Sequence, residues 1–287
     1  MTHTLRFHVS DRSLELRTQD HAAYTALAAV WESCREPMVP ACSAHVMEVR
    51  PEGTRVRFWL DGEKSGRTVA PETLLPSLDL AIYEQLASWS SPGRALLHGA
   101  CLVGANNSVL ITGPSGAGKS SLAWAGIERG YHYACDEIAV SDGASVWGIS
   151  RAVLYDLAPD GAVLPPWIEG ADTAAYRLLD NFGRRCALPL RKPPPAQIVR
   201  AAWPCSQTHI VVARRGAKTR LGALDPLLAL HLLYQERWGD EHIELRDLVH
   251  RDRCFELEWS EPAAAWDLIA PQIGPPPALV PTSAQRR

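Results

Sequence analysis

The sequence lacks any apolar stretch long enough to cross a bilayer, and its first residues lack the apolar core of a signal peptide. We therefore expect neither a membrane-spanning helix nor secretion. The seven cysteines are scattered, and none forms a C-x-x-C pair, so their spacing indicates neither a zinc site nor a disulfide framework. Cysteine usage of this kind fits a reducing compartment, and we expect a cytoplasmic protein.

A strong charge of either sign is also missing. The formal net charge is −3 over 287 residues, of which 46% are hydrophobic and 21% charged. This is the composition of an ordinary globular protein, and it gives no electrostatic reason to expect nucleic acid or an anionic membrane as a partner. The length allows one substantial domain together with a smaller unit.

One segment carries a clear functional pattern. Residues Val109 to Thr112 are apolar or β-branched and predict a short buried strand. After it, Gly113, Gly118, Lys119 and Ser120 satisfy the spacing G-x-x-x-x-G-K-[ST] of a phosphate-binding loop. The glycines let backbone N–H groups converge on an anion, Lys119 offers a charge to the β- and γ-phosphates, and the Ser120 hydroxyl can ligate Mg²⁺. The pattern predicts ATP and Mg²⁺ as cofactors, bound by Gly113, Pro114, Ser115, Gly116, Ala117, Gly118, Lys119, Ser120 and Ser121.

A helix is predicted from Lys119 to Arg129, with Gly130 as its left-handed end, followed by a strand from Tyr131 to Val140. That strand carries two adjacent acids, Asp136 and Glu137, which are costly in an apolar strand unless they have a function. In a parallel α/β sheet the carboxyl ends of neighbouring strands meet at one crevice. We expect Asp136 beside the γ-phosphate, as general base or Mg²⁺ ligand, and Glu137 as a second catalytic acid and metal ligand.

A histidine precedes the loop. Residues Arg94 to Val103 read as a strand, and the turn Gly104–Asn107 predicts that this strand pairs antiparallel with the loop strand. His98 would then lie near the phosphate loop, where it could serve catalysis or be a structural histidine; the residues leave both readings open.

The rest of the sequence predicts domain boundaries and secondary structure, with few candidate functional residues. Residues 1–70 predict a small α+β unit of unknown role, and residues 71–270 a P-loop domain that begins with a helix over 71–89. From Pro271 to the end, the composition predicts a disordered, proline-rich tail. Arg184 and Arg185 are candidates for a contact with the phosphoryl group, or are simply solvated. Asp225 and Pro226 predict the start of a helix through Tyr234, with His231 in the core.

Several of these residues together resemble a known family. Leu97-His98-Gly99-Ala100, the loop Gly113–Ser120, Gly130 and the pair Asp136-Glu137 are similar to the catalytic domain of the bacterial HPr kinase/phosphorylase group, and most of all to its HPr-kinase-related branch. The resemblance covers residues 94–140 well and the rest weakly.

The resemblance implies an α/β P-loop domain similar to HPr kinase and PEP carboxykinase, preceded here by a small α+β unit. It also implies transfer of phosphate from ATP to a serine of a protein or peptide. Asp136 would be the base, His98 would assist proton transfer, and Lys119 and Ser120 would hold phosphate and Mg²⁺. Relatives in the group can be oligomeric, so a homo-oligomer is compatible with the resemblance.

Two departures from the family pattern bear on function. The second acid is Glu137, where the family has aspartate, and the glycine-rich downstream segment that the family uses for dephosphorylation is not recognisable. The second departure argues against a reverse, phosphorolytic reaction and against HPr itself as the acceptor. The alternatives are a P-loop ATPase or ATP-binding regulatory switch, in which the acids hold metal and activate water, and a kinase of a small metabolite.

Overall fold

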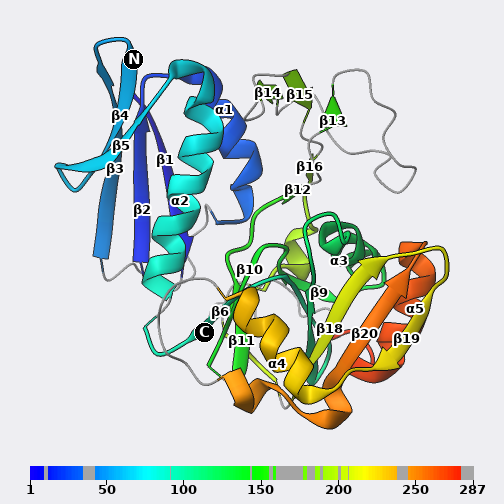
Figure 1. The fold of residues 1–287 in the computed structure, drawn as a ribbon. Helices are drawn as coiled ribbons and strands as arrows, with labels where there is room; N and C mark the ends of the chain where they lie inside the picture. The colour runs from blue at the N-terminus through cyan, green and yellow to red at the C-terminus, as the bar shows by residue number, and fades with distance from the viewer. Residues whose placement is uncertain are drawn as a thin grey trace. The chain divides into compact units, whose positions relative to one another are not determined.

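The computed structural model describes residues 1–9, 12–34, 43–90, 92–142, 144–154, 158–159, 177–179, 185–187, 190–199, 202–205, 207–237 and 245–278. The chain forms two compact units of mixed α/β structure (Figure 1). The first consists of Met1–Trp89 and Leu154–Lys192, and the second of Ser90–Val153 and Pro193–Arg287. None of the helices among these described residues combines the length and the apolarity that crossing a membrane requires.

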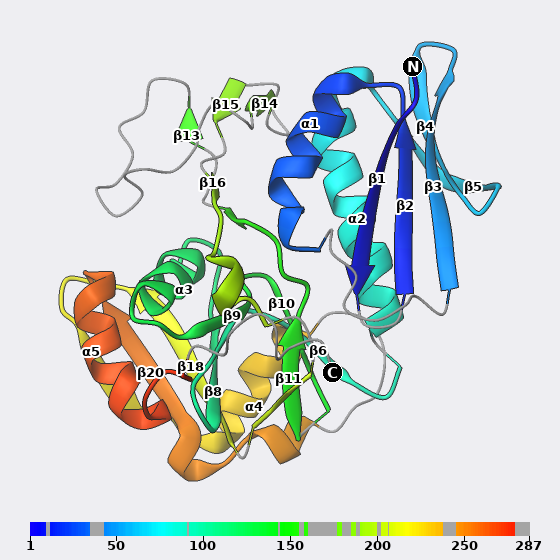
Figure 2. The ribbon, with the colours of Figure 1, turned by 180° about the vertical axis from the view of Figure 1, so that it is seen from behind.

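The first unit contains a five-stranded sheet with the order β1-β2-β3-β4-β5. All neighbouring strands are antiparallel except β2 and β3, which run parallel. Helices α1 and α2 lie against one face of this sheet (Figures 1 and 2). The bounds are β1 His3–Val9, β2 Arg12–Thr18, α1 His21–Val30, β3 Ser43–Glu52, β4 Arg55–Leu60, β5 Glu63–Val69 and α2 Leu74–Ser90.

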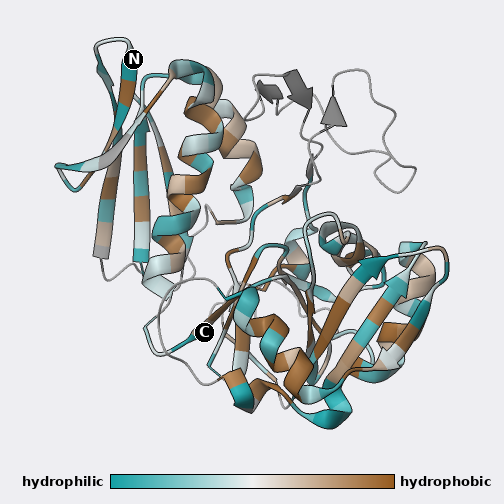
Figure 3. Cartoon of the chain, viewed as in Figure 1, coloured by the Kyte–Doolittle hydropathy of each residue, from teal (hydrophilic) through white to brown (hydrophobic). Residues whose placement is uncertain are grey.

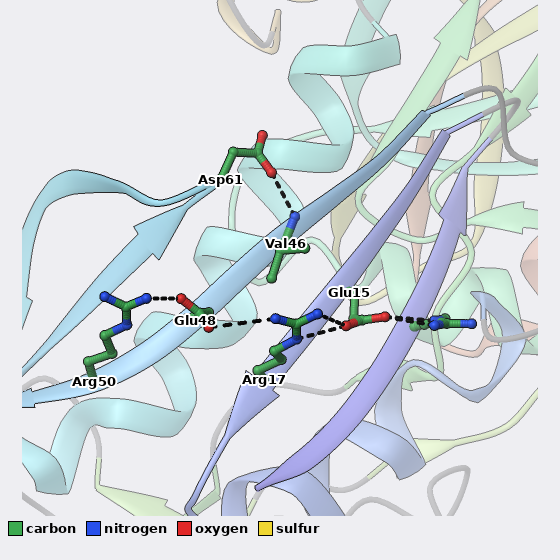
Figure 4. Close-up of polar contacts among 7 residues, drawn as sticks. Glu15, Arg17, Val46, Glu48, Arg50 and Asp61 are labelled. Carbon is green, nitrogen blue, oxygen red and sulfur yellow. Dashed lines mark hydrogen bonds and ion pairs between the residues drawn. The ribbon is translucent and has the colours of Figure 1, made fainter.

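Alternation along the strands separates the two faces of this sheet (Figure 3). On the outer face a row of opposite charges crosses three strands, from Arg6 and Glu15 to Arg17, Glu48 and Arg50 (Figure 4). Glu15 lies 2.8 Å from Arg6 and 2.7 Å from Arg17. Exposed pairs of this kind contribute little stability each, but they keep the outer face polar.

Helix α2 belongs to the first unit, although the sequence predicted a domain boundary at residue 70. The indole Nε1 of Trp31 donates to Asp79 Oδ1 of α2 at 2.7 Å, and the rings of Trp31 and Tyr83 lie 5.5 Å apart. Leu78 and Ile82 of α2 are fully buried. Burial of this apolar stripe ties the helix to the N-terminal sheet, which moves the boundary to Ser90.

The second unit contains a six-stranded sheet, β19-β20-β18-β8-β7-β9, and a four-stranded sheet, β17-β11-β10-β6. Strands β8, β18 and β20 are parallel to one another, and the other pairs are antiparallel. The predicted hairpin is confirmed as β7 with β8. The bounds are β6 Ala95–His98, β7 Ala100–Val103, β8 Asn107–Thr112, β9 His132–Cys135, β10 Ile138–Ser141, β11 Ser145–Gly148, β17 Trp203–Pro204, β18 Gln207–Arg215, β19 Arg220–Ala223 and β20 Cys254–Trp259.

Helices α3 (Lys119–Glu128) and α5 (Pro262–Ile273) lie side by side on one face of the six-stranded sheet (Figure 2). Their approach depends on a glycine: a Cβ on Gly126 would come within 2.3 Å of the Trp266 ring. Trp266 Nε1 donates to the Leu122 carbonyl at 2.6 Å and closes the contact. The core of the second unit therefore includes α3, the helix that follows the loop Gly113–Gly118.

Helix α4 (Pro226–Gln235) begins as predicted, with Asp225 accepting hydrogen bonds from two N–H groups of the first turn. The prediction that His231 lies in the core is wrong, because α4 buries Ala229 and Leu233 and turns His231 to solvent. The other short elements are β12 Val153–Leu154, β13 Ala158–Pro159, β14 Arg177–Leu179, β15 Arg185–Ala187, β16 Leu190–Arg191 and the 3₁₀ turns Glu32–Cys34, Pro71–Thr73, Pro195–Gln197, Leu245–Leu248 and Arg251–Arg253.

Two predicted strands are each divided in the structure. The strand predicted from Arg94 to Val103 is two strands in different sheets, which separate at Gly99, where a Cβ would lie 2.7 Å from the Ile111 carbonyl oxygen. The strand predicted from Tyr131 to Val140 is interrupted at the two acids, between β9 and β10.

The predicted disordered tail does not begin at Pro271. Helix α5 continues to Ile273, which is buried, and the backbone beyond it is held in place. The Tyr131 hydroxyl donates to the Gly274 carbonyl at 2.7 Å, and Ala105 N–H donates to the Pro275 carbonyl at 3.0 Å. Burial of Ile273 and these bonds stabilise the segment; residues 279–287 lie outside the described residues.

Candidate active site

The loop between β8 and α3 is shaped by its glycines. Gly113, Gly116 and Gly118 have φ values of 139°, 79° and 83°, in the region that residues with a Cβ rarely adopt. A Cβ on Gly113 would lie 2.3 Å from the Ala213 carbonyl oxygen of β18, so the loop closes directly on the neighbouring strand. Trp259 Nε1 donates to the Ala117 carbonyl at 2.9 Å and holds the far side of the loop. The curvature that the motif predicts is therefore present.

Helix α3 begins at Lys119, directly after the loop. Gly118 caps the helix without a side-chain hydrogen bond, so the cap residue itself leaves the first N–H groups of α3 to other partners. Pro114, Ser115 and Gly116 are exposed at the tip of the loop. A helix N-terminus that presents N–H groups and the positive end of its dipole is suited to an anion such as phosphate.

Lys119 lies beneath the loop. The residue is only 9% exposed, and its Nζ donates to the Gly113 carbonyl at 2.8 Å and to the Pro114 carbonyl at 3.5 Å. The ammonium group thus brings a positive charge to the carbonyls at the start of the loop. In this position Lys119 has the charge that binding of a polyphosphate requires.

Asp136 lies next to Ser120, in the first turn of α3. Strand β9 lies at the edge of the sheet and runs in the same direction as β8, because each is antiparallel to β7, which lies between them. The carboxyl ends of β8 and β9 therefore lie at the same edge of the sheet. Asp136 follows β9, is 6% exposed, and accepts a hydrogen bond from Ser120 Oγ at 3.3 Å. The Tyr133 hydroxyl donates to its other oxygen at 2.9 Å.

The side-chain oxygens of Ser120 and Asp136 are suited to Mg²⁺, which prefers hard oxygen ligands and is usually bound by one or two protein groups, phosphates and water. Ser120 and Asp136 supply a hydroxyl and a carboxylate side by side. Among the residues that the structure describes, no group of three or more His, Cys, Asp or Glu side chains gathers as a metal site. A hydroxyl beside one carboxylate suits a metal whose other ligands are phosphate oxygens and water.

Glu137 follows Asp136 in the bend between β9 and β10. Its carboxylate forms an ion pair with Arg151, whose side chain is 8% exposed, and its carbonyl accepts from Gly99 N–H at 2.9 Å. Asp136 contacts Ser120 and Tyr133, whereas the Glu137 carboxylate contacts Arg151. The sequence predicted metal ligation for Glu137; the structure places its carboxylate on Arg151.

His98 lies at the end of β6, opposite Ile138 in the β6–β10 ladder and so close in the fold to the two acids. Its Nδ1 is 2.7 Å from Glu236 Oε2, and its backbone N–H donates to the Glu236 carbonyl at 2.7 Å. Its carbonyl accepts from Thr112 Oγ1, the last residue before the loop, at 3.2 Å. A carboxylate on Nδ1 fixes the orientation of the ring.

Sequence reasoning missed Tyr133, Arg151 and Glu236. Tyr133 carries a weak signal, since a buried tyrosine hydroxyl needs a partner and an acid follows three residues later. Arg184 lies outside the described residues, and for Arg185 the structure describes only the backbone in β15, which belongs to the first unit.

No family model and no curated protein matches this chain. Among solved structures, the chain is similar to the Hpr(Ser) kinase/phosphatase from Coxiella burnetii, with 19% sequence identity over 60% of this chain and 90% of that chain. The TM-score is 0.26, which marks a distant structural relationship and carries no argument about function.

Proposed function

We propose that this protein is an ATP- and Mg²⁺-dependent kinase that transfers the γ-phosphoryl group to the hydroxyl of a serine in a protein or peptide. One observation carries the proposal: the Ser120 hydroxyl and the Asp136 carboxylate meet at the N-terminus of α3, beside a glycine loop with a buried lysine. The choice of serine as the acceptor comes from the family resemblance in residues 94–140.

Each residue of the site has a separate task. Backbone N–H groups of the loop and the Lys119 ammonium bind the phosphates, and the Ser120 hydroxyl is the group that would hold the metal. Bound ATP would supply the phosphoryl group, and bound Mg²⁺ would offset part of the phosphate charge. Positioning of this kind supplies most of the rate in phosphoryl transfer, because the protein does little covalent chemistry.

Asp136 is the group proposed to take the proton. As the acceptor oxygen bonds to phosphorus and the bond from phosphorus to the departing ADP oxygen breaks, the acceptor hydroxyl gives its proton to Asp136. The hydrogen bond from Tyr133 holds the carboxylate in one orientation. Glu137 is proposed to stabilise the bend after β9 through its ion pair with Arg151. His98 is proposed to assist at the site from its position near the two acids, with its ring oriented by Glu236.

Two variants test the proposal with labelled ATP and a panel of serine-containing peptides. Lys119→Ala is expected to lose nucleotide binding and turnover together. Asp136→Asn is expected to keep nucleotide binding within a few-fold and to lose transfer by at least about a hundredfold, the usual effect of removing a general base. Arg214→Gln, a surface substitution outside the site, serves as the control.

The products distinguish a kinase from the alternatives. A kinase labels an acceptor, whereas an ATPase or a regulatory switch releases inorganic phosphate or releases nothing. Rapid release of phosphate with every acceptor tested, retained in Asp136→Asn, would refute both the reaction class and the role of Asp136.

A further inference from the structure

The phosphate loop has two sides, and they carry different chemistry. In the order β20-β18-β8-β7-β9, the acid site follows β9, while β18 and β20 lie on the other side of β8. Because β8, β18 and β20 are parallel, their carboxyl ends lie at the same edge of the sheet. Strand β18 ends at Arg215 and β20 at Trp259, and the register pairs these two residues.

Trp259 is built into the loop. It is fully buried, its Nε1 donates to the Ala117 carbonyl, and its ring lies 2.3 Å from the position that a Cβ on Gly118 would occupy. The Arg215 guanidinium carbon lies 3.6 Å from the centroid of the Trp259 ring, and its Nε is 3.0 Å from the same Cβ position. Arg215 is therefore held flat on the indole and against the phosphate loop, while the residue as a whole is exposed.

Three arginines lie near the carboxyl ends of β18 and β20, and their contacts differ. Arg214 and Arg220 both pair with Glu258, at 2.7 Å and 2.9 Å. Arg215 lies beside Gly118, the cap residue of α3, close to the positive end of the helix dipole. A planar guanidinium with one face on an indole is a surface on which a nucleobase stacks, and the charge adds a cation–π contribution.

We infer that Arg215, stacked on Trp259, is the platform for the base of the bound nucleotide. The inference rests on the proposed function, which puts the transferred phosphoryl group at Asp136. The nucleoside end of the nucleotide then leaves the loop on the opposite side, where β18 and β20 end. Arg215 consequently contributes to binding of the nucleotide and not to the transfer step.

Binding of MgATP and of magnesium tripolyphosphate to the full-length protein tests this inference, because tripolyphosphate has the phosphates without a base. Arg215→Ala is expected to weaken ATP binding about tenfold, within the range found when a side chain that stacks on a base is removed, and to change tripolyphosphate binding less than threefold. Arg215→Lys keeps the charge without the plane and is expected to show the same contrast. The matched control, Arg214→Gln, is expected to bind both ligands like the wild type.

Turnover supplies the second readout: the KM for ATP should rise by the same factor in Arg215→Ala while kcat stays within twofold. Equal losses for ATP and tripolyphosphate in both variants, or no loss at all, would overturn the base platform and leave the kinase proposal intact. Wild-type protein that binds neither ligand would overturn the proposed function, and this inference with it.

Discussion

Gly116 and Gly118 provide a matched pair for measuring how closely the phosphate loop fits its surroundings. Their φ values are 79° and 83°, so alanine meets nearly the same backbone strain at either position. A Cβ on Gly116 has no atom within 4 Å, whereas a Cβ on Gly118 lies 2.3 Å and 2.9 Å from two ring carbons of the buried Trp259. The difference between the two variants therefore measures the steric contribution of the indole together with the smaller one of Arg215 Nε, which lies 3.0 Å from the same position.

The expected magnitudes follow from these environments. Left-handed backbone costs a residue with a Cβ about 1–2 kcal/mol, which is the whole expected loss for Gly116→Ala. Gly118→Ala adds overpacking of about 1–3 kcal/mol, because the buried indole is rigid and its Nε1 bond to Ala117 resists movement. We expect Gly118→Ala to lose about 2–5 kcal/mol in the free energy of unfolding of the second unit.

Urea unfolding followed by tryptophan fluorescence measures both variants against the wild type, with the m-value as a check on the two-state treatment. A loss for Gly118→Ala no larger than that for Gly116→Ala would refute the reasoning. It would mean that Trp259 is not packed against the loop, and the base platform would lose its support as well.

Three further predictions concern residues around the site. Burial lowers the pKa of His132 in the folded protein, where neither ring nitrogen has a hydrogen-bond partner. The unfolded chain, in which histidine has its ordinary pKa of 6.5, therefore binds more protons at low pH, and stability falls as the pH drops through that value. His132→Phe should lessen the loss of stability between pH 7.5 and 5 in urea titrations, and an unchanged loss would contradict this. Glu137→Gln should cost about 1–2 kcal/mol in urea unfolding, because it weakens the pair with the buried Arg151, and should leave the Mg²⁺ concentration for half-maximal activity unchanged; a large rise would support metal ligation instead. Glu236→Gln should lower kcat with little change in the KM for ATP if it orients His98, and equal kinetics in the variant and the wild type would rule that role out.

The local parts of the fold were predictable because their signals lie within a few consecutive residues. The loop spacing, the helix from Lys119, the cap at Asp225 and the hairpin of β7 with β8 each follow from neighbouring side chains and backbone preferences. The sequence did not predict the break at Asp136 and Glu137, because residues typical of a buried strand stand on both sides of the two acids. The strand ends there because the chain passes from the six-stranded sheet to the four-stranded sheet.

The amino-acid sequence by itself determined the phosphate-loop motif and the acids that lie near it along the chain. Only the tertiary structure decided which acid reaches Ser120, since Ser120 and Tyr133 donate to the carboxylate of Asp136, whereas the carboxylate of Glu137 pairs with Arg151. The same holds for Trp259, which lies more than a hundred residues beyond the loop and packs on Gly118. Sequence patterns describe what neighbouring residues favour, whereas the surroundings of a site come from strands that meet only after the sheet has formed.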